Sequence, residues 1–556
     1  MRWTTTHRSR RQGWSGILLA LAVLSFGCGG DASETRSADP AATVSGGTAI
    51  VGVSAGATTL LPPLAAAALD FELGGALFLA LNHAEWRDGR LEYLAAHPLA
   101  LARSWTFGSD GASLVYALDT SYHWSDGRPI RAADVVFTYE LLSDPELALP
   151  LSSATEHLDS VVAVTDSTVA FHFDRPYPGM LFDTGVGIIP LHVYGDVPRV
   201  ELRGLPLHRD KGEGSLVVSG PFRLESWQPN DRIVLSRNSA GEVQSSLDRV
   251  VIRVLPEETT RLAELRGGGL DLAQVSSYRA ATELETTDGI RVERIPQRGY
   301  DYIAWNPGAH PAFADAQVRR AFSLAIDRKE IIAALDMGEY AEPAHGPYGS
   351  LFARLAPPPP DEPGFNPAEA RRTLENAGWR DEDGDGVREK GDVRLEFELA
   401  TTAGNARRES AVQIIQSQLA AVGARAELRL EDFSALLGRV IDRQYESALL
   451  GWQVSLDPDI SVFWGDPGSP FNVVGYADET ARALIDSAQA QSSSDAAAPY
   501  WRRAAERIAA DHPYAFLWFF DLPVAIGPRL RGVDVSVTGF AGSIYRWWIP
   551  RQAQIP

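Results

Sequence analysis

Cysteine is almost absent from this 556-residue chain, which contains one cysteine and three methionines. The single cysteine, Cys28, cannot form an internal disulfide, so no disulfide framework supports the fold. Long apolar runs are also missing: beyond the N-terminal segment, none reaches the roughly 20 residues that a membrane-spanning helix needs. The sequence contains no repeat of fixed period, which argues against a solenoid or a propeller.

Several chemical signatures are missing as well. The sequence has no His-Glu-x-x-His motif, no paired cysteines and no phosphate-binding loop. Positive charge is scarce, since 51 lysines and arginines face 72 aspartates and glutamates for a net charge of -21. Such an acidic chain argues against nucleic acid as a partner.

The N-terminus has the pattern of an export signal. Arginines at its start precede an apolar run over residues 17–24, and a glycine precedes Cys28. The run is too short to span a bilayer, so residues 1–28 are predicted to be a signal peptide. Residues 29–47, rich in small and polar side chains, are predicted to be a flexible tether. The position of Cys28 resembles the lipobox of bacterial lipoproteins, which implies an acylated Cys28 and an extracytoplasmic protein held to a membrane by lipid.

The rest of the chain predicts an α/β fold with more than one lobe. A chain of this length with 45% hydrophobic residues is globular and too long for a single core. Residues 393–399 alternate as a strand, 410–422 have helical spacing, and 424–430 alternate again. This order indicates parallel strands joined by crossover helices. Asp315, Asp327 and Asn366 are positioned to cap helices.

A short turn-forming segment, Trp124-Ser125-Asp126-Gly127, raises the question of catalysis because His123, Asp126 and Asp134 lie close together in the sequence. Asp-Gly favours a turn, the preceding residues alternate as a strand, and the following residues have an amphipathic helical pattern. The residues alone leave two readings open, a catalytic site and a structural corner between a strand and a helix.

This segment, with Ala133-Asp134-Val135-Val136-Phe137 after it, resembles the signature of the family 5 solute-binding proteins, the extracytoplasmic receptors of peptide and nickel ABC importers. Other segments resemble the family in the same order, namely 189–192, 219–224, 269–271, 318–328 and 368–379. The resemblance spans roughly residues 48–550. It favours the structural reading of the corner.

The resemblance implies the two-lobed periplasmic-binding-protein fold of type II, cluster C, with lobes joined by a two-strand hinge. The expected crossings lie near residues 297–303 and 514–520. The first lobe would comprise 48–296 and 514–556, and the second 304–513. By the same resemblance the protein is a monomeric receptor and not an enzyme. It closes over a peptide-like or other oligomeric solute and delivers it to ABC permease subunits with their ATPase.

The positions expected to bind the ligand depart from those of the family's dipeptide receptors. Those receptors hold the amino group of the ligand with an aspartate three residues after a tryptophan, and the carboxylate with an arginine just before a helix. Here Ser455 follows Trp452 at that distance, and Asp457 belongs to the next Asp-Pro pair. No arginine precedes Asn405, and Arg407 would substitute only if the loop is rearranged. Because an unpaired buried ion costs several kcal/mol, a longer peptide or an oligosaccharide-like ligand is predicted over a free dipeptide.

Aromatic side chains are also expected to contact the ligand in the binding cleft. Trp452, Trp464 and Trp305 are candidates on the second lobe, facing Thr58, Thr59 and Leu60 of the first. Packing in a core is the alternative role for each tryptophan.

Two other functional classes remain in view. Gly52-Val53-Ser54-Ala55-Gly56 fits the nucleophile elbow of serine hydrolases, which would make the protein an exported hydrolase acting through Ser54. Pro62 and Pro63 interrupt the helix that such an elbow requires. A peptide-binding sensor or chaperone without transport is the third possibility.

An acidic loop offers a candidate calcium site. Asp381, Asp383, Asp385, Glu389 and Asp392 occupy positions 1, 3, 5, 9 and 12 of an EF-hand-like loop, and oxygen ligands on alternate residues suit calcium. A solvated acidic turn is the alternative. No other cofactor is expected.

Export and acylation can be tested by changing Cys28 to serine. The wild type is expected to partition into the detergent phase because of its acyl chains, whereas Cys28→Ser stays in the aqueous phase. Equal aqueous partitioning of the two proteins would refute the acylation of Cys28.

Overall fold

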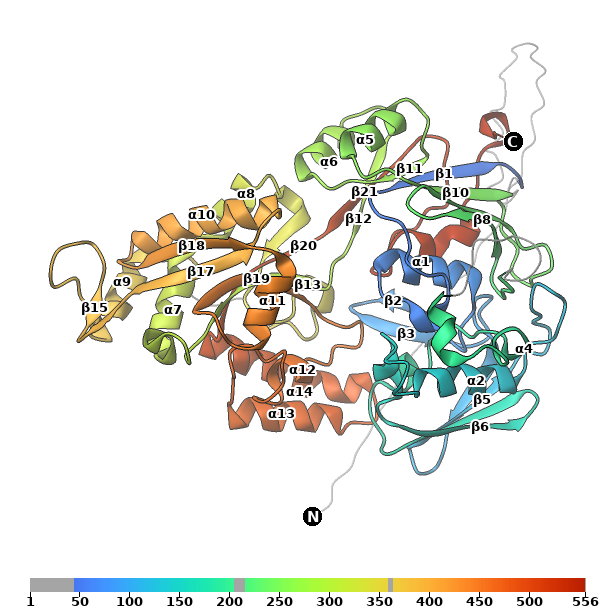
Figure 1. Ribbon diagram of the computed structural model, residues 1–556, viewed down its shortest axis with the longest axis horizontal. Coiled ribbons are helices and arrows are strands. Elements are labelled where there is room, and N and C mark those ends of the chain that lie inside the picture. The colour runs from blue at the N-terminus through green and yellow to red at the C-terminus, as the bar shows by residue number, and fades with distance from the viewer. Residues whose placement is uncertain (1–44, 205–215, 359–363, 556) are drawn as a thin grey trace, which may run out of the picture. The chain divides into compact units, whose positions relative to one another are not determined.

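The computed structural model describes residues 45–204, 216–358 and 364–555 (Figure 1). Cys28, the signal peptide and all but the last residues of the tether lie outside these ranges. No helix in the described part of the chain is both long enough and apolar enough to cross a membrane.

Three sheets organise the described residues. The seven-stranded sheet has the order β12 (Arg291–Ile295), β21 (Leu522–Ile526), β11 (Leu272–Gln274), β1 (Thr48–Val53), β10 (Arg249–Val254), β9 (Arg232–Arg237) and β8 (Phe222–Gln228). The six-stranded sheet has the order β14 (Ala341–Pro343), β20 (Tyr514–Phe520), β13 (Gly299–Trp305), β19 (Ser447–Gln453), β17 (Glu396–Thr402) and β18 (Arg425–Glu431). The four-stranded sheet has the order β4 (Ala102–Phe107), β5 (Ser113–Leu118), β7 (Thr168–Phe173) and β6 (Leu158–Thr165). Two-stranded ribbons are formed by β2 (His83–Arg87) with β3 (Arg90–Leu94) and by β15 (Glu389–Lys390) with β16 (Val393–Arg394).

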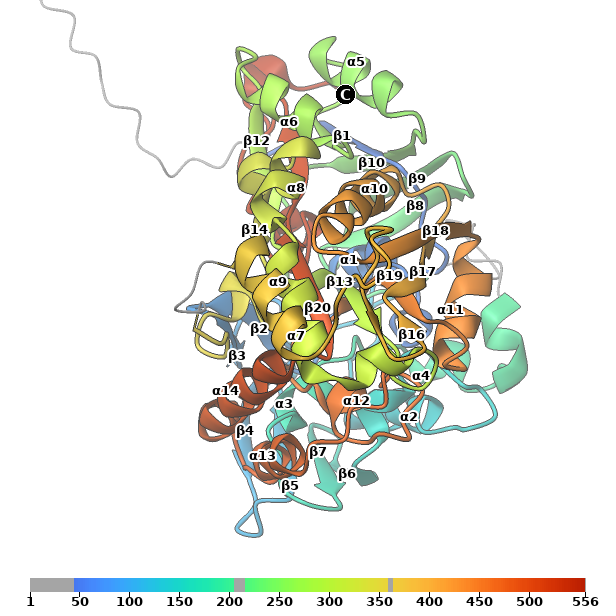
Figure 2. The same cartoon turned by 90° about the vertical axis from the view of Figure 1, so that its left-hand side faces the viewer.

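Helices connect and cover these sheets. Before strand β13 they are α1 (Ala68–Leu77), α2 (Ala132–Leu142), α3 (Met180–Asp183), α4 (Leu191–Tyr194), α5 (Glu258–Arg266) and α6 (Tyr278–Glu285). After it they are α7 (Ala316–Ala325), α8 (Arg328–Ala334), α9 (Pro367–Asn376), α10 (Ala406–Ala420), α11 (Phe433–Ile441), α12 (Ser461–Trp464), α13 (Glu479–Gln489) and α14 (Ser494–Asp511). The last two, α13 and α14, pack side by side (Figure 2).

The crossover pattern predicted from the sequence is confirmed. Strand β17 pairs in parallel with both β18 and β19, with α10 connecting β17 to β18 and α11 connecting β18 to β19. The buried side of α10 carries Ala411, Val412, Ile415 and Leu419, which pack in the same core as strand β17. The α/β fold class therefore follows from hydrophobic periodicity in this region.

The predicted helix caps are also confirmed. The side chain of Asp315 accepts a hydrogen bond from the backbone of Gln317, and Asp327 accepts one from Glu330. Asn366 caps α9 in the same way, ahead of Pro367 at the first helical position. Each cap satisfies a backbone N–H that the helix itself leaves without a partner.

The Trp-Ser-Asp-Gly corner is held by its own polar groups. Gly127 has a φ of 87°, a conformation that favours glycine. The buried Trp124 donates from Nε1 to Asp134 (3.3 Å), which also accepts from the backbone of Leu191 (2.9 Å). Asp126 pairs with His192 at 2.7 Å. Both aspartates thus tie the corner to α4, which fits the structural reading.

The chain passes between the seven-stranded and six-stranded sheets at two adjacent places. Residues 296–298 join β12 to β13, and Asp521 joins β20 to β21. The backbone of Gln297 donates to the carboxylate of Asp521 (3.4 Å), so the two joints lie side by side. Strand β20, which the boundary drawn from the sequence gave to the first lobe, pairs with β13 and β14. Because β20 pairs within the six-stranded sheet, the chain returns to the seven-stranded sheet at Asp521.

The core beneath the six-stranded sheet depends on Trp305, which is fully buried against Phe313, Phe322 and Phe397. Trp305→Ala is expected to lower the free energy of unfolding by about 3–5 kcal/mol, since it removes a large buried side chain and leaves a cavity. Urea unfolding measures the loss. Phe433→Ala, at a half-exposed aromatic, is the matched control and is expected to change stability by less than about 1 kcal/mol. A loss at Trp305 no larger than at Phe433 would contradict this account.

Candidate ligand-binding cleft

Two segments far apart in the sequence face each other in the candidate cleft. The loop between β19 and α12 carries Asp457, and the segment before α3 carries Tyr177 and Gly179. A Cβ atom added at Gly179 would lie 2.7 Å from an Asp457 carboxylate oxygen. The Asp457 carboxylate therefore rests against backbone, and any residue larger than glycine at position 179 would displace it.

The cleft gathers acidic groups. Tyr177 donates its hydroxyl hydrogen to Asp183 (2.6 Å). Burial, and then the charge of Asp459, raises the pKa of Asp457 to about 7. Burial, with the charge of Asp457 adding to it, raises the pKa of Asp183 to about 8. Among the described residues, no hydrogen bond or ion pair to the Asp457 carboxylate is found. A cation in this position would relieve the repulsion.

A small cavity adjoins this acidic group, and a larger one shares part of its lining. One of about 30 Å³ is lined by Asp457 together with Trp86 and Tyr93 of the β2–β3 ribbon and Phe352. The other, of about 490 Å³, shares Trp86 and is lined by Phe519 and Asp521 beside the chain crossing. The larger volume is within the range of small-ligand sites in proteins.

Ion pairs bridge the same two sides. Asp495, at the start of α14, pairs with Arg90 of strand β3 at 2.6 Å and with Arg354 at 2.8 Å. All three side chains are about half exposed, so each pair contributes little alone. The Arg90 pair links the β2–β3 ribbon to α14.

Of the predicted ligand residues, Trp452 and Trp464 pack together around Tyr514. Trp452 donates from Nε1 to the Tyr514 hydroxyl (3.3 Å) and stacks on Tyr302. Trp464 is almost fully buried, with its ring 4.7 Å from that of Tyr514. Trp452 is partly exposed, so of these two tryptophans it is the one that a ligand can reach.

Arg407 is already engaged. Its guanidinium pairs with the fully buried Asp301 (3.0 Å) and lies 4.1 Å from the ring centre of Phe520. Arg408 pairs with the same carboxylate (2.8 Å). Two arginines share one acid, and a ligand carboxylate would have to compete with Asp301 for either.

The other predicted residues are dispersed. Thr58 donates from its backbone and hydroxyl to Asp70 (2.7 and 2.6 Å), and Thr59 accepts from the backbone of Leu61. Leu60 is buried in the core, as is Trp305 in its separate aromatic cluster. Ser455 is partly exposed on the same loop as Asp457. The structure therefore brings Asp457 to the cleft, leaves Ser455 on the same loop, and places Leu60 and Trp305 in packing roles.

Ser54 follows β1 and is exposed. Its hydroxyl donates to the Gln274 side chain (3.3 Å), an amide that cannot act as a general base. The first helical turn after it, a 3₁₀ turn over Pro62–Leu64, is not the helix that a nucleophile elbow requires.

The acidic loop brings Asp381, Asp383 and Asp385 within ligand distance of one another. Asp381 accepts hydrogen bonds from the backbone of Gly384 and Gly386, which closes the loop on itself. Arg394 pairs with Asp383 and Asp385 and supplies positive charge there. Glu389 lies on β15, and Asp392 is exposed beside it. Calcium binding stays a prediction.

The sequence did not single out Tyr93, Tyr177 or Asp183. The only local signal is the run Pro176-Tyr177-Pro178-Gly179, whose turn-forming residues end just before α3. Nothing in that run indicates that the fold brings it against Asp457.

Comparison with known proteins assigns the chain to one class. Residues 98–471 match the model of the bacterial extracellular solute-binding proteins, family 5 Middle. The match covers more than half of the chain, which therefore belongs to this family of solute-binding proteins. Their role is to bind solutes outside the cytoplasm, and they are not enzymes as a class.

Particular relatives extend the match over nearly the whole length. The oligopeptide-binding protein AppA of Bacillus subtilis is 28% identical over 552 residues, which cover 96% of this chain and 98% of the relative. The structure of AppA in complex with a nonapeptide has a TM-score of 0.72 at 26% identity, covering 92% of this chain and all of AppA. The ABC transporter substrate-binding protein CtaP of Listeria monocytogenes, at 22% identity, shares the fold with a TM-score of 0.75 and covers 91% of this chain and 99% of its own.

The acidic pair makes a pH-dependent contribution to stability. Because the folded pKa of Asp183 is raised, its contribution is full below about pH 4 and is lost as pH rises through about 8. Asp183→Asn removes this dependence. The melting temperature of the wild type relative to the variant is expected to fall between pH 4 and 8. Asp486→Asn, at an exposed position on α13, is the control that should leave the profile unchanged. Parallel profiles for wild type and Asp183→Asn would contradict the assignment.

Proposed function

We propose that this protein captures a peptide longer than two residues and delivers it, chemically unchanged, to the permease and ATPase subunits of an ABC importer. It works as a monomer held at the membrane surface by acylated Cys28. The observation that carries the proposal is the similarity to an oligopeptide-binding protein along nearly the whole chain. The acidic groups of the cleft further indicate which part of the peptide is bound.

The acidic pair receives a positive group of the ligand. Asp457 and Asp183 approach each other without a cation among the described residues, and burial opposes their charged forms. A peptide ammonium placed between them neutralises the pair and forms charge-assisted hydrogen bonds. Closing over such a ligand is more favourable than closing over nothing, so binding and closure are coupled.

The other end of the peptide has no dedicated cation. Arg407 and Arg408 share Asp301, and removing either from it would leave a buried carboxylate less well paired. A dipeptide must bury its carboxylate close to its ammonium, whereas a longer peptide can extend its carboxylate towards solvent. Length discrimination follows from this asymmetry.

Isothermal titration can measure this preference with a dipeptide, a pentapeptide, the same pentapeptide acetylated at its N-terminus, and a tetrasaccharide. The pentapeptide with a free amino group is expected to bind most tightly. Asp457→Asn should weaken it by about 10-fold or more, the loss of a hydrogen bond to a charged group, and should leave the acetylated peptide unaffected. Asp486→Asn serves as the control on the same lobe.

Tight binding of the dipeptide, or of the tetrasaccharide alone, would contradict the proposed ligand class. Equal affinity for free and acetylated pentapeptides would refute the role of the acidic pair. Small-angle scattering with saturating pentapeptide should give a smaller radius of gyration, and an unchanged profile would refute closure.

A further inference from the structure

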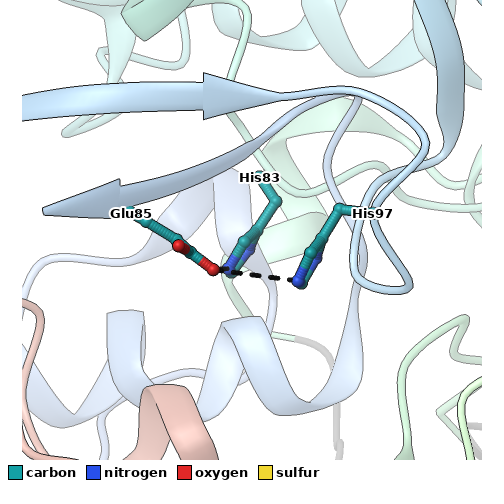
Figure 3. Close-up of side chains that lie close together, drawn as sticks. All are labelled: His83, Glu85 and His97. Carbon is teal, nitrogen blue, oxygen red and sulfur yellow. Dashed lines mark ion pairs between the residues drawn. The ribbon is translucent and has the colours of Figure 1, made fainter. Parts of the chain in front are cut away.

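A cluster of two histidines and a glutamate lies on the β2–β3 ribbon (Figure 3). His83 and Glu85 are on strand β2, and His97 follows strand β3. The two imidazole rings stack at 4.1 Å between centres and 7° between planes. Nε2 of each ring lies 3.9 Å from the same oxygen, Oε1 of Glu85. Three potential ligand atoms thus converge within 4.8 Å.

The backbone brings these side chains together in two ways. Alternation along β2 puts His83 and Glu85 on one face of the ribbon. The chain after β3 then turns through Ala96, whose φ of 53° is unusual for a residue with a side chain, and this turn brings His97 alongside. Trp86 and Tyr93, which line the small cavity, belong to the opposite face. The cluster therefore lies on the other face of the ribbon from these two aromatic residues.

We infer that His83, Glu85 and His97 form a binding site for a borderline divalent metal ion, with Zn²⁺ as its representative. Two imidazole nitrogens and one carboxylate oxygen are a donor set that suits Zn²⁺, Ni²⁺ or Cu²⁺ better than Mg²⁺ or Ca²⁺. Three protein ligands leave a fourth position for water.

The carboxylate of Glu85 directs one of its oxygens at the two rings. Arg87 pairs with Oε2 of Glu85 and leaves Oε1, the oxygen directed at both rings, for the ion.

Binding requires two small changes. A tetrahedral ion with bonds of about 2.0–2.2 Å separates its ligands by about 3.4 Å, so the 3.9 Å distances close by about 0.5 Å as the rings tilt towards Glu85. His97 accepts a hydrogen bond at Nδ1 from the backbone of Leu99 (3.1 Å), which places its proton on Nε2. Coordination by Nε2 moves that proton to Nδ1 and gives up this bond, which lowers the affinity.

An ion here would link the first strand of the ribbon to the chain beyond its second strand. The same ribbon carries Trp86, whose ring meets that of Phe352 at 5.2 Å, and Arg90, which pairs with Asp495. Metal binding would thus stiffen the element that reaches across to α14. This inference does not depend on the identity of the transported solute.

The test is a titration of the metal-free protein, prepared without a histidine tag, with ZnCl₂ against a chromophoric chelator. One equivalent is expected to bind. His83→Gln and His97→Gln should each weaken binding by more than the roughly 10–100-fold cost of losing an outer-shell partner. His157→Gln, at a partly exposed histidine on the four-stranded-sheet side, is the matched control and should bind as the wild type does.

Circular dichroism of the metal-free variants checks that they fold. X-ray absorption of the Zn²⁺-loaded wild type should show two imidazole ligands, and Glu85→Gln should retain both of them while binding more weakly. Failure of the wild type to bind one equivalent, binding that survives in His83→Gln and His97→Gln, or loss of binding in Asp385→Asn instead, would overturn the assignment.

Discussion

One buried carboxylate ties together three elements around the six-stranded sheet. Asp301, in the middle of strand β13, is fully out of solvent and pairs with Arg407 and Arg408 at the start of α10, while Trp518 of β20 donates to it at 3.1 Å. A buried ion without partners would cost several kcal/mol, so β13, β20 and α10 are constrained together. Even Gly451 on β19 reflects this, because a Cβ atom there would lie 2.6 Å from the Asp301 carboxylate.

The same constraint shapes recognition. Arginines that are committed to an internal acid are less available to a ligand, whereas Asp457 and Asp183 have each other as neighbours and no cation among the described residues. Among the described residues, the Asp457 carboxylate therefore has no cationic partner, whereas Arg407 and Arg408 are both paired with Asp301. Under the proposed function, this difference, more than the volume of the cavities, would set the chemical preference of the cleft.

Local patterns in the sequence predicted much of the fold. The caps at Asp315 and Asn366, the crossover from β17 through α10 to β18, and the corner at Gly127 each depend on a few adjacent residues, so periodicity and turn chemistry suffice to find them. The family resemblance supplied the rest of the architecture. The boundary at β20 was misplaced because its apolar run reads the same whichever sheet it joins.

The cleft was harder to predict because its residues meet only after folding. Trp305 and Trp452 are both tryptophans at the ends or edges of apolar strands, yet one is sealed in a core and the other keeps an exposed edge. Asp183 lies in an unremarkable short helix, and its raised pKa comes from burial and from a carboxylate on a distant loop. No spacing rule within one segment encodes such an encounter.

The two chain crossings lie next to each other, and this limits how the two sheets can move relative to one another. Residues 296–298 and Asp521 lie side by side and are joined by the Gln297 to Asp521 hydrogen bond. Two neighbouring joints define a single axis, so the two sheets can turn about it but can hardly slide or twist independently. Under the proposed closure, occupancy of the cleft would be converted into one angle between two outer surfaces. A membrane partner touching both surfaces would distinguish loaded from empty protein by geometry alone, without contacting the solute.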